Sequence, residues 1–239
     1  AGGAAALNQV WERDLDAGMR RTATRPIAAG RLGVTESLFV SVAISLLGLI
    51  ALWVSFGPQP AFLGALSLAV YVFLYTPLKT RTTFNTHVGA VVGALPPLMG
   101  WVAATGSPAG GGWDLFAVLF IWQIPHFLLI AWFCREDYKR VGMKMLSVFD
   151  DAKGSMTNRQ VLWSSVVMVP VSLLPVRSGM VGDFSFWSAL VLGVILVGMA
   201  AHLVWKPKRQ AGRRLFLALL LYLPLYFGFL LVDRLWILA

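Results

Sequence analysis

This sequence of 239 residues contains little cysteine and little charge. Cys134 is the single cysteine, which excludes a disulfide within the chain and a cluster of thiolate metal ligands. Charged residues make up 13% of the chain, whereas soluble globular domains carry roughly 25%. Hydrophobic residues make up 58%, and the mean hydropathy is +0.73. Water is therefore not the main solvent of this protein.

Most of the sequence consists of long stretches without a charged side chain. Residues 37–78 contain none, and Gly57-Pro58-Gln59-Pro60 divides this stretch into two halves, which predicts a helical hairpin across a bilayer. The other uncharged runs cover residues 82–113, 115–134, 160–176, 184–205 and 215–232. A membrane-spanning helix needs about 20 apolar residues. We therefore predict an all-α transmembrane bundle with seven complete spans, at about 36–56, 60–75, 86–104, 113–134, 160–176, 184–205 and 214–232.

The chain begins at Ala1, without a Met and without a cleavable signal pattern. Residues 1 to about 18 are apolar at their start and predict the end of a further membrane helix. We expect residues 1–239 to form a single membrane domain that is truncated at its N-terminus.

The net charge of +9 could indicate an acidic or nucleic-acid partner. However, 18 of the 20 basic residues fall in alternate loops, and only Arg177 and Arg234 fall in the others. Cytoplasmic loops of membrane proteins retain Lys and Arg. The basic loops are therefore predicted to face the cytoplasm or its organellar equivalent, and no nucleic-acid partner is implied. The longest loop, 135–159, carries many charges of both signs, so we expect it to be ordered and functional.

A row of polar side chains lies near the start of the chain. Asn8, Glu12 and Asp16 recur every four residues, which places them on one side of a helix, whereas Asp14 points elsewhere. Ionisable groups at membrane depth cost free energy unless a partner satisfies them, and they usually have a function. Mg²⁺ characteristically binds one or two carboxylates together with substrate phosphates. The row therefore predicts a magnesium site.

An ordinary acidic interface is the alternative interpretation of this row. Arg13 and Arg20 are near enough in sequence to balance its charge. The residues alone leave both interpretations open.

A second charged cluster follows the fourth predicted span. Residues 135–140 read Arg-Glu-Asp-Tyr-Lys-Arg, and the span before them contains Trp-Gln-Ile-Pro-His-Phe at 122–127. The alternation of spans places this cluster on the same side as Asp16. Two acidic clusters with interleaved cations suit the ionisation of an allylic diphosphate, because metal ions and basic groups neutralise the leaving group while an apolar cavity excludes water. Each loop could also be a basic membrane anchor with compensating acids.

Two histidines lie within apolar spans or at their ends. His87 and His126 could each ligate a metal, bind a porphyrin iron or only hydrogen-bond across helices. The last role is the commonest, so neither histidine alone identifies a ligand.

The third predicted span carries two structural signals. Gly89 and Gly93 form a small-xxx-small pattern, which lets two helix backbones approach closely. Pro96 and Pro97 follow in mid-span and predict a break or kink there.

Four blocks of residues, in this order, resemble a known family. The first reads Asn-Gln-Val-Trp-Glu-Arg-Asp-Leu-Asp at 8–16, followed by Met19, Arg21-Thr22 and Arg25-Pro26. The others are Tyr-Thr-Pro-Leu-Lys at 75–79 with Asn85, Gly89-Ala90, Gly93-Ala94, Pro96-Pro97 and Gly100-Trp101; Trp122-Gln123 with Pro125-His126-Phe127; and Arg-Glu-Asp-Tyr at 135–138 with Gly142 and Met145. Together they closely resemble the protoheme IX farnesyltransferase (haem O synthase) branch of the UbiA prenyltransferase superfamily.

The resemblance implies nine transmembrane helices around a lipid-open cavity, so this chain would lack the first helix and the start of the second. It implies transfer of a farnesyl group from farnesyl diphosphate to a vinyl group of haem B, with addition of water, to give haem O and diphosphate. Mg²⁺ is the implied cofactor. The implied location is the bacterial inner membrane or the mitochondrial inner membrane, with hand-off of the product to haem A synthase or to terminal oxidase assembly.

The resemblance also implies roles for individual residues. Asn8, Glu12 and Asp16 match the superfamily's first Asp-rich motif, with Glu12 in place of the middle Asp. The second motif, two Asp residues four apart, is not reproduced, because Cys134 and Tyr138 stand at its positions. The expected sets are Asn8, Glu12 and Asp16 for catalysis; these three with Glu136 and Asp137 for the metal; Arg20, Arg21, Arg25, Lys79, Arg135 and Lys139 for the diphosphate; and His126 for a haem contact.

Two other functions compete with this one. A related prenyltransferase with an aromatic or quinone-type acceptor would use the same diphosphate chemistry, but its second motif would normally be the regular pair of Asp residues. A non-catalytic membrane haem carrier would depend on His126 and would tolerate loss of Glu12 or Asp16. The carrier leaves the carboxylate row unexplained.

Overall fold

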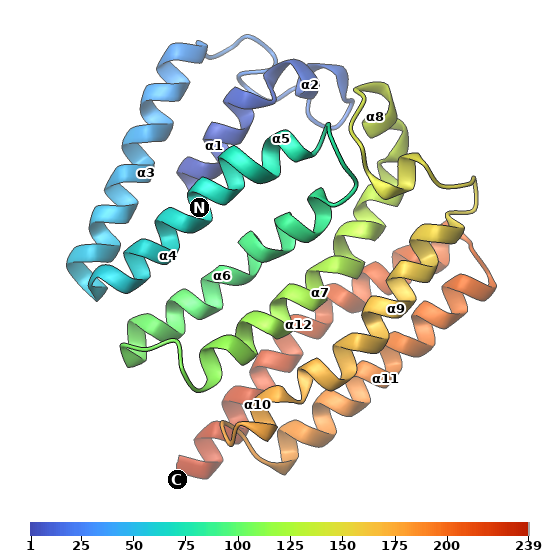
Figure 1. Cartoon of the computed structure of the whole chain (residues 1–239). Coiled ribbons are helices and arrows are strands. Elements are labelled where there is room, and N and C mark those ends of the chain that lie inside the picture. Colours follow the sequence, from blue (N-terminus) through green and yellow to red (C-terminus); the bar gives the residue numbers. More distant parts are fainter. Residues whose placement is uncertain (239) are drawn as a thin grey trace.

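The computed structural model describes residues 1–238, and over this range the chain forms helices and connecting segments only (Figure 1). The predicted all-α class is confirmed. The helices are α1 Gly2–Trp11, α2 Arg13–Gly18, α3 Val34–Phe56, α4 Pro58–Ala69, the π-helix η1 Val70–Tyr75, α5 Thr76–Leu78, α6 Asn85–Thr105, α7 Gly111–Phe133, α8 Arg135–Arg140, the 3₁₀-helix η2 Leu146–Val148, α9 Ser155–Ser172, α10 Leu174–Arg177, α11 Asp183–Trp205 and α12 Arg209–Leu238.

Within residues 1–238, seven helical stretches are long and apolar enough to cross a membrane. Their bounds are Val34–Phe56, Pro58–Leu78, Asn85–Thr105, Gly111–Phe133, Ser155–Arg177, Asp183–Trp205 and Arg209–Ile237. Each predicted span coincides with one of these stretches, apart from small differences at the ends. The predicted number of spans is confirmed.

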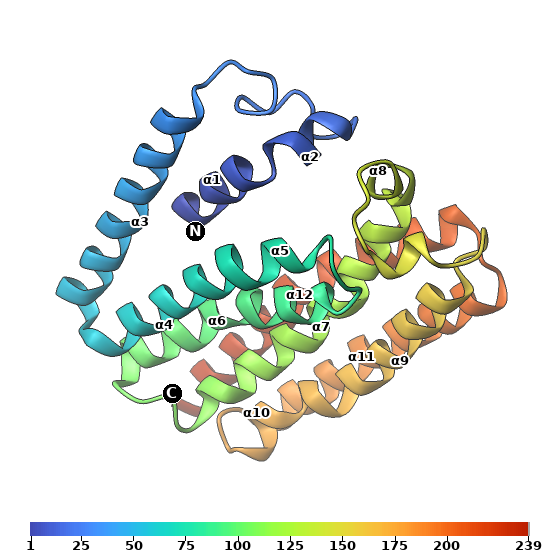
Figure 2. The same cartoon turned by 45° about the horizontal axis from the view of Figure 1, so that its top comes forward.

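The helices pack against their neighbours along the chain, and the C-terminal ones close into a bundle. Helix α7 packs on α6 and α9, α9 packs on α11, and α12 returns from α11 to contact α7. On the other side, α4 packs on α6, and α3 packs on α1 and α4. Helix α3 therefore stands at the outer edge of the molecule (Figure 2), where most of its large apolar side chains are exposed, as expected for a lipid-facing helix.

The alternating direction of the spans brings α2, α5 and α8 to one end of the molecule, at the upper right of Figure 1. The basic segments 19–33, 79–84, 134–154 and 206–208 all connect helices at this end. The segregation of basic residues predicted from the sequence is therefore present in the fold.

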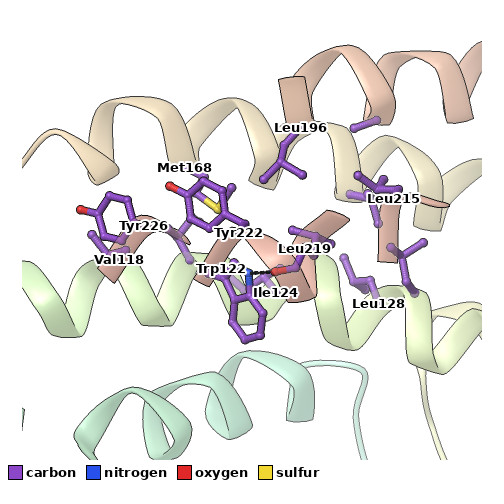
Figure 3. Close-up of a cluster of buried hydrophobic side chains, with 14 of the residues drawn as sticks. Val118, Trp122, Ile124, Leu128, Met168, Leu196, Leu215, Leu219, Tyr222 and Tyr226 are labelled. Atoms are coloured by element: carbon purple, nitrogen blue, oxygen red, sulfur yellow. Dashed lines mark hydrogen bonds between the residues drawn. The ribbon is translucent and has the colours of Figure 1, made fainter. Parts of the chain in front are cut away.

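The bundle of α7, α9, α11 and α12 encloses the largest apolar core (Figure 3). Two of its buried donors bond to helix carbonyls. The indole Nε1 of Trp122 donates to the carbonyl of Leu219 at 2.9 Å, and the hydroxyl of Tyr226 donates to the carbonyl of Ser172 at 2.8 Å. Such internal partners matter in a bilayer, because no water is available to replace them.

The small-xxx-small pattern in α6 brings it close to two different partners. Gly89 lies against the ring of Tyr75 in η1, and Gly93 lies against the side-chain amide of Gln123 in α7. The amide Nε2 of Gln123 donates to the carbonyls of Ala90 at 3.3 Å and Leu119 at 3.0 Å. The predicted packing role of these glycines is therefore confirmed.

The predicted break at Pro96-Pro97 is wrong, because α6 runs without interruption from Asn85 to Thr105. The kink that the two prolines also predict stays a prediction. Membrane helices accommodate proline where neighbouring groups satisfy the freed carbonyls. The irregular span is the preceding one, in which the π-helix η1 separates α4 from α5.

The segment 135–159 is ordered, as predicted. It forms α8 and η2 and then enters α9, whose first turn is capped by the carboxylate of Asp150. The two oxygens of this carboxylate accept hydrogen bonds from the backbone N–H groups of Met156 at 3.0 Å and Thr157 at 2.7 Å. Such a cap fixes where α9 begins.

The contact between Gly93 and Gln123 allows a direct test of helix packing. We expect Gly93→Ala to lower the free energy of unfolding by about 1–3 kcal/mol, because the new methyl group displaces a buried amide from its hydrogen bonds. The measurement is the thermal unfolding midpoint of the purified protein in detergent.

Gly100→Ala is the matched control, because Gly100 lies in the same helix and a Cβ there meets no atom within 4 Å. It should leave the midpoint unchanged or raise it, since Ala favours the helix over Gly. Equal effects of the two substitutions would contradict the packing role of Gly93.

Candidate functional site

The polar row predicted near the start of the chain is buried. Asn8, Glu12 and Asp16 are 6%, 3% and 1% exposed, whereas the side chain of Asp14 is 88% exposed. The backbone turns at Glu12, where α1 ends and α2 begins. Hydrogen bonds from Glu12 N–H to the Asn8 carbonyl at 2.8 Å and from Asp16 N–H to the Glu12 carbonyl at 2.7 Å keep the helical spacing across this turn. The three side chains therefore face inward together.

The row faces α5, which ends the second of the seven spans, Pro58–Leu78. The amide Nδ2 of Asn8 donates to the hydroxyl of Thr76 at 3.2 Å. The ammonium of Lys79 lies 3.0 Å from the carboxylate of Glu12, and both residues are almost completely buried. Because these contacts join residues 67 and 68 positions apart, only the tertiary structure could reveal them.

The π-helix η1 determines how α5 meets the row. The backbone N–H of Thr76 donates to the carbonyl of Tyr71, five residues earlier, and its hydroxyl donates to the same carbonyl at 2.8 Å. Pro77 follows and has no N–H to continue the regular pattern. A π turn rotates the helix that follows it, and such turns are frequent at functional sites. The Nζ of Lys79 also lies 4.6 Å from the centroid of the Tyr75 ring.

Asp16 has its own cationic partner. The guanidinium of Arg25 donates to Asp16 Oδ2 at 2.8 Å, and the hydroxyl of Thr22 donates to the Asp16 carbonyl at 3.0 Å. The segment after α2 therefore folds back over the row. Arg13 pairs with Asp14 on the surface at 3.3 Å, so the counter-charges of the row differ from those that the sequence suggested.

Helix α8 reaches this end of the molecule with both of its acids paired to arginines. Glu136 pairs with Arg135 at 3.3 Å, and its side chain is 75% exposed. Asp137 pairs with Arg140 at 3.5 Å, and Arg140 in turn donates to the carbonyl of Gly18 at 3.5 Å. Glu136 and Asp137, the two acids of α8 that were expected to bind metal, therefore form ion pairs within their own helix.

Tyr138 is the buried residue of α8, at 8% exposed. Its hydroxyl accepts a hydrogen bond from Arg21 Nη2 at 3.4 Å. Burial raises the pKa of the Tyr138 phenol, and the nearby positive charge of Arg21 opposes this shift. The phenol therefore stays protonated at neutral pH. In the sequence, Tyr138 stands out only by its position in the motif and as the one aromatic residue among the charges of 135–140, and this second feature was the available signal.

The six cations expected to bind diphosphate divide into three groups. Lys79 and Arg25 contact the buried carboxylates, and Arg21 contacts Tyr138. Arg135 contacts Glu136 and the carbonyl of Asp151. Arg20 and Lys139 are exposed at the same end of the molecule. The structure thus brings Lys79 and Arg25 onto the row and Arg21 onto Tyr138. The other three cations lie at the same end of the molecule.

Asn85 joins two segments beside the site, a role that the sequence analysis did not predict. Its amide Nδ2 donates to the carbonyls of Thr82 at 2.6 Å and Lys144 at 2.9 Å. The backbone N–H of Lys144 donates to the carbonyl of Lys79 at 2.6 Å. The segment after α8 therefore holds the backbone of Lys79 in place. The signal available in the sequence was an amide side chain at the start of an apolar span. The structure shows that this amide is buried.

His126 lies between α7 and α12, on the side of α7 that faces the C-terminal bundle. Its ring stacks between Trp122, at a centroid distance of 4.9 Å, and Phe216, at 4.8 Å. Its Nδ1 is buried without a hydrogen-bond partner among the described residues. The structure does not bring His126 into contact with the row, and its role as a haem contact stays a prediction. His87 stacks on Phe84 at 5.0 Å.

The carboxylate row fits a hard cation in part. Among residues 1–238, no three His, Cys, Asp or Glu side chains converge as they would in a metal site built from protein alone. Asp16 Oδ1 is nevertheless buried and has no hydrogen-bond partner in this part of the chain. A buried carboxylate oxygen without a donor is costly unless a cation or ligand satisfies it. This donor set suits Mg²⁺, which completes its coordination with substrate phosphates and water.

The sequence and the fold both match known proteins. The model of the UbiA prenyltransferase family matches residues 1–227. The chain is 43% identical to the protoheme IX farnesyltransferase of Solibacter usitatus over 98% of its own length and 80% of that protein, and 40% identical to that of Opitutus terrae over 100% and 81%.

Two solved structures share the fold. One is described under digeranylgeranylglyceryl phosphate synthase, with a TM-score of 0.79, 15% identity and coverage of 97% of this chain and 80% of that one. The other is a UbiA homologue from Aeropyrum pernix in its apo form, with a TM-score of 0.72, 20% identity and coverage of 97% and 84%. These matches agree with the all-α membrane bundle. The chain belongs to the UbiA prenyltransferase family.

Proposed function

We propose that this protein transfers a farnesyl group from farnesyl diphosphate to a vinyl group of haem B, with addition of water, to form haem O and diphosphate. The observation that carries the proposal is the near-full-length similarity to relatives named protoheme IX farnesyltransferase, at 36–43% identity. Residues 1–239 act as one membrane domain in this proposal. Farnesyl diphosphate and haem B are its substrates, and haem A synthase or the assembly of a terminal oxidase would receive the product.

The residues around the carboxylate row suit the departure of diphosphate. Ionisation breaks the bond between C1 of the farnesyl group and the bridging oxygen, and the electron pair leaves with the diphosphate. Lys79, Arg25 and Arg21 lie where they can bind the developing negative charge. The outer cations Arg20, Arg135 and Lys139 would attract the substrate to this end of the molecule.

The apolar helices protect the farnesyl cation. A cavity of about 420 Å³ lies between α1, α3, α4 and α6, and its walls include Gly3, Leu49, Leu68 and Met99. Helix α1 leads from this cavity to the polar row, so a farnesyl chain could extend into it while its diphosphate stays at the row. Apolar walls keep water from the cation until the haem vinyl group attacks it. Water then adds to the resulting haem cation, with release of a proton.

Mg²⁺ is the cofactor in this proposal. Asn8, Glu12 and Asp16 would hold it, and Glu136 and Asp137 are further candidates that would first have to leave their ion pairs. When bound, Mg²⁺ supplies positive charge that stabilises the leaving diphosphate. The orphaned Oδ1 of Asp16 is the observation that supports this assignment.

The first experiment supplies the protein, in membranes, with haem B, farnesyl diphosphate and Mg²⁺, and analyses the extracted pigments by chromatography and mass spectrometry. We expect a haem B derivative heavier by one farnesyl group and one water, and we expect EDTA to abolish it. If an aromatic or quinone-type acceptor is prenylated in place of haem, haem B is the wrong acceptor in this proposal, and the diphosphate chemistry stands. Tight haem binding without any transfer would favour a haem carrier.

The carboxylate row can be tested with a matched pair of substitutions. We expect Asp16→Asn to reduce the rate of haem O formation by about 100-fold or more, because a ligand that helps to stabilise the leaving group loses its charge. Asp14→Asn removes the same charge from an exposed neighbour and should leave the rate unchanged. Equal rates for the two variants would exclude a role for the buried row in catalysis.

The proposed orientation places the basic loops on the cytoplasmic side, or on the matrix side in a mitochondrion. In a Cys134→Ser background, we expect Ala109→Cys to react with a membrane-impermeant maleimide added to spheroplasts, and Thr80→Cys to react only after lysis. The two positions lie in loops at opposite ends of the bundle. The reverse labelling pattern would contradict the orientation.

A further inference from the structure

Tyr138 contacts the segment that follows the carboxylate row, through Arg21. It belongs to α8, whereas the row belongs to α1 and α2, and the two parts of the chain approach each other at the upper right of Figure 1. The ring packs in a small core with Met19, Met143 and Met145. Met19 directly follows α2, so this core joins the two parts of the chain. The position of the phenol is therefore set by packing from both sides.

The hydroxyl of Tyr138 has one hydrogen-bonding function left over. Arg21 donates to its oxygen at 3.4 Å. An arginine side chain has no acceptor, so the phenol cannot donate in return. Among residues 1–238, no acceptor for the Tyr138 hydroxyl lies within hydrogen-bonding distance and angle. The phenol proton is therefore available to a group that the protein itself does not supply.

The surroundings of this hydroxyl select an anionic acceptor. The guanidinium of Arg21 lies 3.4 Å from the hydroxyl. The positive charges of Arg21 and Lys79 both oppose the rise that burial causes in the pKa of the phenol. The carboxylates of α8 are elsewhere, since Glu136 and Asp137 pair with arginines of their own helix. Two cations and a free hydroxyl proton form a donor set suited to phosphate oxygens.

We propose that the Tyr138 hydroxyl binds the prenyl diphosphate directly, as a hydrogen-bond donor to a diphosphate oxygen. This inference rests on the proposed function, which brings an allylic diphosphate to the site. When the bond between C1 and oxygen breaks, the electron pair moves to the diphosphate, and the hydrogen bond from Tyr138 becomes stronger as that charge develops. The phenol keeps its proton throughout. Helix α8 thus contributes a neutral donor to the substrate where the sequence suggested metal-binding acids.

The test compares Tyr138→Phe with the wild-type protein in lipid nanodiscs. Calorimetric titration with inorganic diphosphate in the presence of Mg²⁺ measures affinity without any dependence on turnover. We expect the substitution to weaken binding about 10-fold or more, the loss typical of a hydrogen bond to a charged group. In kinetic assays, kcat should fall and the KM for haem B should stay the same. Phe retains the ring in its core, so the thermal unfolding midpoint should not change.

Tyr222→Phe is the matched control. It removes a phenol hydroxyl that is buried in the C-terminal bundle (Figure 3) and has no hydrogen-bond partner among the described residues. Its diphosphate affinity should equal that of the wild type. Wild-type affinity in Tyr138→Phe, or equal losses in both variants, would overturn the assignment of Tyr138.

The outcomes separate this inference from the proposed function. If haem O forms and Tyr138→Phe binds diphosphate as tightly as the wild type, the reaction stands and the role of Tyr138 is wrong. If the wild type binds diphosphate more tightly than Tyr138→Phe but makes no haem O, the role of Tyr138 stands and the acceptor is wrong.

Discussion

The burial of two carboxylates at one end of a membrane bundle is the constraint on which the site depends. A charged group at this depth is costly unless a partner compensates it. Glu12 and Asp16 meet this requirement through Lys79 at 3.0 Å and Arg25 at 2.8 Å. The two cations come from α5 and from the segment after α2, so compensation of the charges also brings separate parts of the chain together. The need to neutralise the charges of the row therefore holds α5 and the segment after α2 against it.

Irregular backbone makes these pairings possible. A regular α-helix through residues 70–79 would direct Thr76 and Lys79 differently, and the π-helix η1 rotates them toward α1. Asn85 and the backbone of Lys144 then hold the end of this span from the other side. A bilayer tolerates such irregular backbone only where it is buried in protein or lines a cavity. The π turn and the buried ion pairs are accordingly gathered at the site, while the bundle of α7, α9, α11 and α12 holds the largest apolar core.

The fold itself does not determine which acceptor is prenylated. A structure described under digeranylgeranylglyceryl phosphate synthase has a TM-score of 0.79 to this chain at only 15% identity. Folds of this kind host different substrates, and the particular residues of a site decide between them. In the proposed reaction the polar row and its cations serve the diphosphate, whose chemistry is common to all such acceptors. Recognition of haem must therefore come from other residues, and His126, enclosed between Trp122 and Phe216, contacts protein rings on both faces.

Local properties of the sequence were enough to predict the class of the fold, the number of spans and the common face of the row. Hydrophobic runs and helical spacing are such properties, so the positions of seven spans and the shared side of Asn8, Glu12 and Asp16 followed from them, whereas the burial of that side is seen in the structure. The break predicted at Pro96-Pro97 was wrong, because a helix with suitable neighbours accommodates proline. The sequence also could not identify the partners of the row, which lie 67 residues away at Lys79 but only nine residues away at Arg25. These contacts and the inward position of Tyr138 appear only in the folded chain. The Lys79 contact depends on how distant helices pack, and the Arg25 contact depends on how the segment after α2 folds back over the row.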